Sequence, residues 1–172
     1  ILILTFAWSL KGMTDSLGAK YFVRDFVYQN ASNFQSFLPA IVFIIGCLLA
    51  FATGTSWGTF GILIPIVQNV FPMDNPLAVV CISACMAGAV CGDHCSPISD
   101  TTIMASAGAQ CDHVNHVSTQ LPYAITVAAV SFVSYLIAGF VPKAYISLPI
   151  ALVLMLLTIF VLHRTLKGKA AA

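Results

Sequence analysis

The chain has 172 residues, of which only 8% are charged, and its formal net charge at pH 7 is +1. A typical soluble domain carries about 25% charged residues, whereas here 59% of the residues are apolar and the mean hydropathy is +0.96. No charged side chain occurs between Asp25 and Asp74, and a membrane-spanning helix needs roughly 20 apolar residues. The composition therefore excludes a soluble globular protein and predicts an integral membrane protein embedded in a lipid bilayer. The small net charge also excludes the basic surface that binding to nucleic acid requires.

The first thirty residues predict two short segments. Residues 1–10 are apolar but too short to cross a bilayer, and they lack the charged start and the cleavage site of a signal peptide. We interpret them as the end of a truncated helix, so the chain is expected to be the C-terminal part of a longer protein. Residues 14–30 combine Lys20 and Arg24 with a broad apolar arc. This pattern favours an amphipathic helix lying in the membrane interface, and a loop helix packed on protein is the alternative.

Two apolar segments further along the chain are each interrupted by a polar, glycine-containing break. Segment 37–71 is interrupted at residues 54–59, and segment 77–109 is interrupted at residues 92–100. Hydropathy leaves open whether segment 37–71 crosses the membrane or turns back at its break. Backbone groups that leave a helix at membrane depth must be satisfied by protein or must line a cavity. Both breaks are therefore expected to have a function, and two kinked helices with satisfied hydroxyls are the alternative.

The C-terminal third predicts two uninterrupted spanning helices, at 119–140 and 148–162, which follow a polar loop at 110–118. The tail contains three basic residues and no acidic one. By the positive-inside rule, this tail predicts a cytoplasmic C-terminus. Counting back places the loop at 110–118 inside and the loop between the last two helices outside.

The second break carries the side chains that a small hard cation prefers. It contains two carboxylates, Asp93 and Asp100, and an ionisable side chain within the membrane is a functional candidate. Burial disfavours the charged form of a carboxylate and a bound cation favours it, so Na⁺ and H⁺ would compete for such a site. Asp93 is the preferred proton-exchanging group, because Asp100 has another explanation. It could be present simply as an acidic residue in the first turn of the next helix, where the helix dipole favours a negative charge. The predicted neutral oxygen ligands are the hydroxyls of Ser96, Ser99, Thr101, Thr55 and Ser56.

Two other interpretations of the same residues fit less well. Cysteines and histidines at 91, 94, 95, 111, 113 and 116 could be drawn as a transition-metal site, but they show no CxxC or HExxH spacing. A membrane hydrolase with Ser96 or Ser99 as nucleophile and His94 as base would lack a GxSxG turn. We therefore expect neither an enzyme nor a cofactor. The six cysteines are interpreted as small buried residues in a reducing setting, and His113 and His116 are placed in a solvated cytoplasmic loop.

Four motifs resemble a known family. They are GTSWGT at 54–59, GDHCSPISDTT at 92–102, CDH at 111–113 and TQLPY at 119–123. Together they closely resemble the C-terminal half of the NhaC family of sodium/proton antiporters. The resemblance implies an all-α polytopic fold that forms one repeat of an inverted-repeat transporter. In that fold, 37–71 would be a re-entrant hairpin with its tip at 54–59, and 77–109 would be a broken helix.

The same resemblance implies a function and its partners. The expected activity is exchange of Na⁺ for H⁺ across the plasma (inner) membrane, with both ions as transported species. The N-terminal half of the same protein would complete the site, so these residues alone should not transport, and a homodimer is expected by analogy. Relatives include exchangers that couple malate, lactate or amino acids to Na⁺ and H⁺, so an exchanger of organic substrates is the alternative. An accessory structural membrane subunit is the alternative from a different class.

Overall fold

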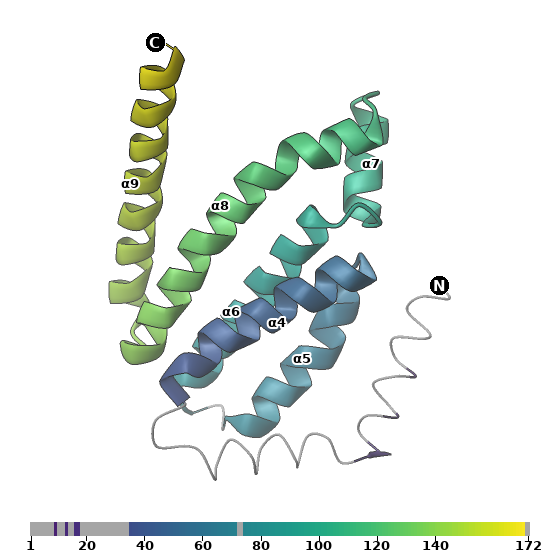
Figure 1. Ribbon diagram of the computed structural model, residues 1–172. Helices are drawn as coiled ribbons and strands as arrows, with labels where there is room; N and C mark the ends of the chain where they lie inside the picture. Colours follow the sequence, from purple (N-terminus) through teal and green to yellow (C-terminus); the bar gives the residue numbers. More distant parts are fainter. Residues whose placement is uncertain (1–8, 10–12, 14–15, 18–34, 72–73, 171–172) are drawn as a thin grey trace.

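The computed structural model describes residues 9, 13, 16–17, 35–71 and 74–170, and in this part of the chain all regular structure is helical (Figure 1). The predicted truncated helix at 1–10 and the predicted interfacial helix at 14–30 lie outside the described residues, apart from residue 9 in the first and residues 16–17 in the second. The described helices are η1 (Gln35–Phe37), α4 (Leu38–Thr53), α5 (Ser56–Val70), α6 (Pro76–Cys95), α7 (Asp100–Gly108), α8 (His113–Phe140) and α9 (Ala144–Ala170).

Helices α4 and α5 form a hairpin. Gly54 ends α4 with φ +66°, in the left-handed region, which glycine adopts without the steric cost of a Cβ atom. The chain then turns back, so that α5 runs beside α4 in the opposite sense (Figure 1). This reversal is the hairpin that the family resemblance implies. The break is shorter than the predicted 54–59, because residues from Ser56 onward already form the first turn of α5, where the Thr59 hydroxyl donates to the Thr55 carbonyl at 3.0 Å.

Helices α6 and α7 form the predicted broken helix. The interruption covers only residues 96–99, whereas the sequence predicted 92–100, so Gly92 and Asp93 lie in the last turn of α6. The reason is local, since Pro97 lacks an N–H donor and disfavours helical backbone only at the residue before it. Ser99 then starts α7 as an N-cap whose Oγ accepts from the backbone N–H groups of Thr101 and Thr102.

Helices α8 and α9 are the two continuous helices at the end of the chain. α8 begins at His113 rather than at the predicted Thr119, because Asp112 caps it by accepting a hydrogen bond of 2.9 Å from the Asn115 N–H. Most of the predicted polar loop at 110–118 is therefore helical, and α9 extends beyond the predicted 148–162 at both ends. Four helices among the described residues are long and apolar enough to cross a membrane: Gln35–Thr53, Pro76–Cys95, His113–Phe140 and Ala144–Thr165. The protein is thus an all-α polytopic membrane protein.

Small residues allow α4 to lie directly against α6. A Cβ atom on Gly88 would collide with the backbone carbonyl of Phe43, and one on Gly92 would collide with the carbonyl of Cys47. The fully buried core residues on α6 are alanines and cysteines, at 78, 81, 84, 85 and 89. Helix association within lipid depends on such close backbone approach. The contact matters for the site, because it fixes the tip of the hairpin relative to the end of α6.

Candidate ion-binding site

The two breaks lie against each other, although they are about 40 residues apart in the sequence (Figure 1). Gly54 at the tip of the hairpin packs on the segment that joins α6 to α7. A Cβ atom there would lie 2.8 Å from the carbonyl oxygen of Ile98. The absence of a side chain at Gly54 therefore allows the hairpin tip to reach the second break.

Asp93 is the buried acid at this junction, with 4% of its surface exposed. Its Oδ1 accepts a hydrogen bond of 2.7 Å from Ser99 Oγ, and its Oδ2 accepts one of 2.9 Å from Thr101 Oγ1. Ser56, the first residue of α5, donates to Oδ2 from 3.4 Å. A carboxylate is thus surrounded by hydroxyls from the hairpin, the interruption and the first turn of α7.

This arrangement suits a small cation chemically. Each hydroxyl oxygen has two lone pairs, so the same groups that donate to Asp93 can rotate and offer oxygen ligands. Carboxylate and hydroxyl oxygens are the ligands that hard cations prefer. The amino end of α7 lies beside the carboxylate, since Ser99 caps that helix and also contacts Asp93. A helix N-terminus is a favourable place for a negatively charged side chain.

The other predicted ligands are placed differently. Ser96 is fully buried, but its Oγ accepts from the Ile98 N–H at 3.4 Å, and no hydrogen bond joins that hydroxyl to the Asp93 carboxylate. Thr55 is half-buried, and its hydroxyl has no hydrogen bond to Asp93 among the described residues. Asp100 is exposed and accepts from the N–H of Thr101 at 2.8 Å, as a first-turn acid does. The structure therefore brings Ser56, Ser99 and Thr101 to Asp93 and leaves Asp100 at the margin.

Three residues near the site were not predicted as part of it. Thr59 and Thr102 are buried, and the Thr102 hydroxyl has no hydrogen-bond partner among the described residues. His113 contacts the interruption itself, where its Nε2 lies 2.7 Å from the Pro97 carbonyl oxygen. The threonines follow Ser56 and Ser99 at helical spacing, which is a signal that the sequence does carry. The position of His113 depends on a tertiary contact that no sequence spacing indicates.

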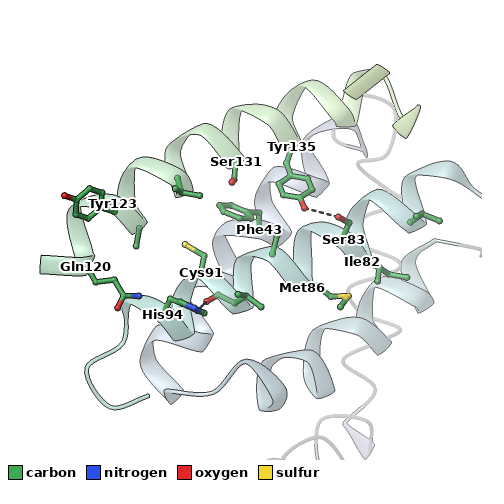
Figure 2. A pocket seen from close by; sticks show the side chains of 15 residues that line it. Phe43, Ile82, Ser83, Met86, Cys91, His94, Gln120, Tyr123, Ser131 and Tyr135 are labelled. Atoms are coloured by element: carbon green, nitrogen blue, oxygen red, sulfur yellow. Dashed lines mark hydrogen bonds between the residues drawn. The ribbon is translucent and has the colours of Figure 1, made fainter. Parts of the chain in front are cut away.

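A separate cavity of about 890 Å³ lies between α4, α6 and α8. Figure 2 shows His94 and Gln120 toward one end of it and the 2.9 Å hydrogen bond between Ser83 and Tyr135 toward the other. Most of the other lining residues are apolar, and none of them is a lysine or an arginine. Asp93 is not among the residues that line this cavity.

The metal-site and hydrolase interpretations find no support in this geometry. Among the residues that the structure describes, no group of three His, Cys, Asp or Glu side chains could hold a metal ion. His94 is exposed, lines the cavity, and has its Nδ1 bonded to the Val90 carbonyl of its own helix at 3.0 Å. It makes no hydrogen bond to Ser96 or Ser99, as a general base for either serine would.

Replacement of Ser99 by alanine is expected to destabilise the protein by about 1–3 kcal/mol. The change removes one oxygen atom, Ser99 Oγ, which both caps α7 and donates a hydrogen bond to the buried carboxylate of Asp93. Thermal unfolding of the purified protein measures the effect. Ser118→Ala is the matched control, because this exposed hydroxyl bonds only a carbonyl in its own helix, and an unchanged Ser99→Ala protein would contradict the assigned role.

Interrupted helices that meet at a buried charged residue are typical of secondary transporters. The profile of the Na⁺/H⁺ antiporter family matches residues 1–140. The chain therefore belongs to the Na⁺/H⁺ antiporter family, which confirms the resemblance drawn from the motifs. The family is one of membrane transporters.

Three curated proteins are similar to this chain in sequence. An uncharacterized protein of Haemophilus influenzae is 49% identical over 81% of this chain and 27% of its own length. The malate-2H⁺/Na⁺-lactate antiporter of Bacillus subtilis is 35% identical over 56% of this chain and 21% of its own. A protein named as an uncharacterized Na⁺/H⁺ antiporter of H. influenzae is 37% identical over 66% of this chain and 23% of its own length. The chain spans about a quarter of the length of these relatives, and no solved structure matches it significantly.

Proposed function

We propose that this chain forms the ion-binding part of a secondary antiporter that exchanges Na⁺ for H⁺. One observation carries the proposal, namely the buried carboxylate of Asp93 with hydroxyls around it from the start of α5, the interruption and the first turn of α7. Membership of the Na⁺/H⁺ antiporter family supports the same activity.

The proposed mechanism is competition for Asp93. In the proton-bound state the carboxyl group is neutral, and the hydroxyls of Ser56, Ser99 and Thr101 have no anion to help them hold a cation. Na⁺ binding requires the carboxylate to be ionised, because burying an uncompensated cation is costly. A bound Na⁺ therefore excludes the proton and a bound proton excludes Na⁺. Alternating exposure of the site to the two sides would turn this competition into exchange.

An exchanger of organic acids with Na⁺ and H⁺ is the second candidate. It is favoured by the relative named as a malate/lactate antiporter and by the cavity of about 890 Å³, a size that small-molecule sites commonly have. The lining weighs against an organic anion, since it offers a carboxylate only neutral polar groups and His94. We therefore place simple cation exchange first.

The rest of the assembly follows as part of the proposal. The remainder of a longer transporter would pack against this chain and complete the transport path, and a homodimer is the expected oligomer. The protein would reside in the plasma (inner) membrane with its C-terminus in the cytoplasm, because the tail residues Arg164, Lys167 and Lys169 are basic. The loop after α8 and the base of the α4–α5 hairpin would then face outside, since Figure 1 shows them at the same end of the bundle.

The test is a flux measurement with the full-length protein in liposomes that hold an acidic interior. Addition of external Na⁺ alone is expected to dissipate the pH gradient, and K⁺ or choline at equal concentration serves as the control. Dissipation that requires added malate, lactate or an amino acid would replace the first candidate with the second. No dissipation under any of these conditions would refute both.

A further inference from the structure

We propose that His113 is a positioning residue of the ion site, acting through the carbonyl group of Pro97. The inference rests on the proposed function and extends it to a residue that does not contact Asp93. His113 is the first residue of α8 and is half-buried. Its imidazole joins three elements, because Nε2 lies 2.7 Å from Pro97 O in the interruption and Nδ1 lies 3.0 Å from Ser106 Oγ in α7.

The direction of the bond to Pro97 is fixed by chemistry. A carbonyl oxygen only accepts, so Nε2 carries a hydrogen and donates it. Ser106 Oγ lies 2.9 Å from the Ile103 carbonyl as well as close to Nδ1, so this hydroxyl can serve His113 as acceptor or as donor. The donor and the acceptor are therefore fixed for the hydrogen bond between His113 Nε2 and Pro97 O, and they are open for the one between Nδ1 and Ser106 Oγ.

The Pro97 carbonyl needs this partner because the helix does not supply one. In a continuous helix its oxygen would accept from the N–H of Thr101. That N–H instead donates to Ser99 Oγ at 3.1 Å and to Asp100 Oδ1 at 2.8 Å. A carbonyl freed in this way is costly to leave unpaired in a membrane protein, and His113 satisfies it from another helix. The bond also makes Pro97 O less available as a cation ligand.

The interruption transmits this contact to Asp93. Ser99, two residues after Pro97, both caps α7 and donates to Asp93 Oδ1 at 2.7 Å. Ser96, the residue before Pro97, is fully buried and caps α6, where its backbone N–H donates to the Asp93 carbonyl. Because only four residues separate α6 from α7, a shift of the Pro97 carbonyl must move at least one of the two serines. His113 thus sets the geometry in which the hydroxyls meet the carboxylate.

Two variants of His113 separate this role from general stability. Glutamine places an amide nitrogen near the position of Nε2 and can still donate to Pro97, whereas asparagine places one near Nδ1 and cannot reach it. We expect His113→Gln to keep the Na⁺ concentration for half-maximal exchange within about 2-fold of wild type. His113→Asn and His113→Ala should raise it by about 3- to 10-fold, the effect of one lost hydrogen bond, with a smaller change in maximal rate.

The measurement is Na⁺-dependent dissipation of a pH gradient by the full-length protein in liposomes, normalised to the amount of folded protein. His116→Gln is the matched control, because His116 lies one turn further along α8 and its imidazole makes no hydrogen bond among the described residues. Equal Na⁺ dependence of the Gln, Asn and wild-type proteins would overturn the role of His113 while leaving the antiport intact. A wild-type protein that shows no Na⁺-driven exchange would instead refute the proposed function.

Discussion

Replacement of Asp93 by asparagine is expected to reduce Na⁺-driven proton movement by about 100-fold or more. Asparagine keeps the size of the side chain but removes both the negative charge and the exchangeable proton. The loss of a charged ligand that accepts from three hydroxyls corresponds to about 3 kcal/mol, taking each tenfold as about 1.4 kcal/mol. Fluorescence quenching by a pH-sensitive dye in proteoliposomes of the full-length protein measures the rate.

The second acid of the same motif provides a matched control. Asp100→Asn makes the same chemical change seven residues away, where the carboxylate is exposed and bonds only the N–H and hydroxyl of Thr101. We expect exchange to fall by no more than a few-fold in this variant. Equal loss of exchange in both variants would show that the two carboxylates act together, contrary to the geometry described here.

Replacement of Gly88 by alanine is expected to destabilise the protein more than any other single methyl addition on α6 away from the site. The new Cβ atom would meet the carbonyl oxygen, the carbonyl carbon and the Cα atom of Phe43. These are backbone atoms, so α4 must move as a whole to make room. Overpacking of this kind costs about 1–3 kcal/mol and occasionally more, and it should appear as a lower midpoint of thermal unfolding in detergent.

Gly61→Ala tests the same substitution where space is available. Gly61 lies inside α5, and a Cβ atom there meets nothing within 4 Å. Alanine in a helix interior is favoured over glycine by roughly 0.5–1 kcal/mol, so this variant should unfold at the wild-type temperature or above it. If Gly88→Ala were as stable as Gly61→Ala, α4 and α6 would not be in the close contact described here.

The sequence was sufficient to predict the membrane class, the helix breaks and the buried acid. Asp93 stands out because carboxylates are rare in apolar segments, and Ser99 stands out because it precedes a helix and follows Pro97 at short distance. Both residues can be recognised from the residues next to them in the sequence, without knowledge of how the helices pack. The hairpin was different, since hydropathy could not distinguish a crossing from a reversal, and only the family resemblance predicted the turn at Gly54.

What could not be predicted depends on how the elements meet. Thr55 and Ser56 are adjacent and chemically similar, yet only Ser56 reaches Asp93, because α5 begins at that residue. The extent of each break was overestimated, because the helices continue into the polar residues: Thr59 lies within α5 and Asp93 within α6, and both are buried there. The contact of His113 with Pro97 joins residues 16 positions apart. It could not be predicted from the sequence, because it depends on where the start of α8 lies relative to the interruption.

The measurement that tests the account most directly is equilibrium binding of ²²Na⁺ to the purified full-length protein, with and without Asp93→Asn, over a range of pH. The account predicts that the wild-type protein binds Na⁺, that added protons compete with this binding, and that Asp93→Asn abolishes it. Binding of Na⁺ by a folded Asp93→Asn protein with unchanged affinity and unchanged dependence on pH would place the ion site elsewhere.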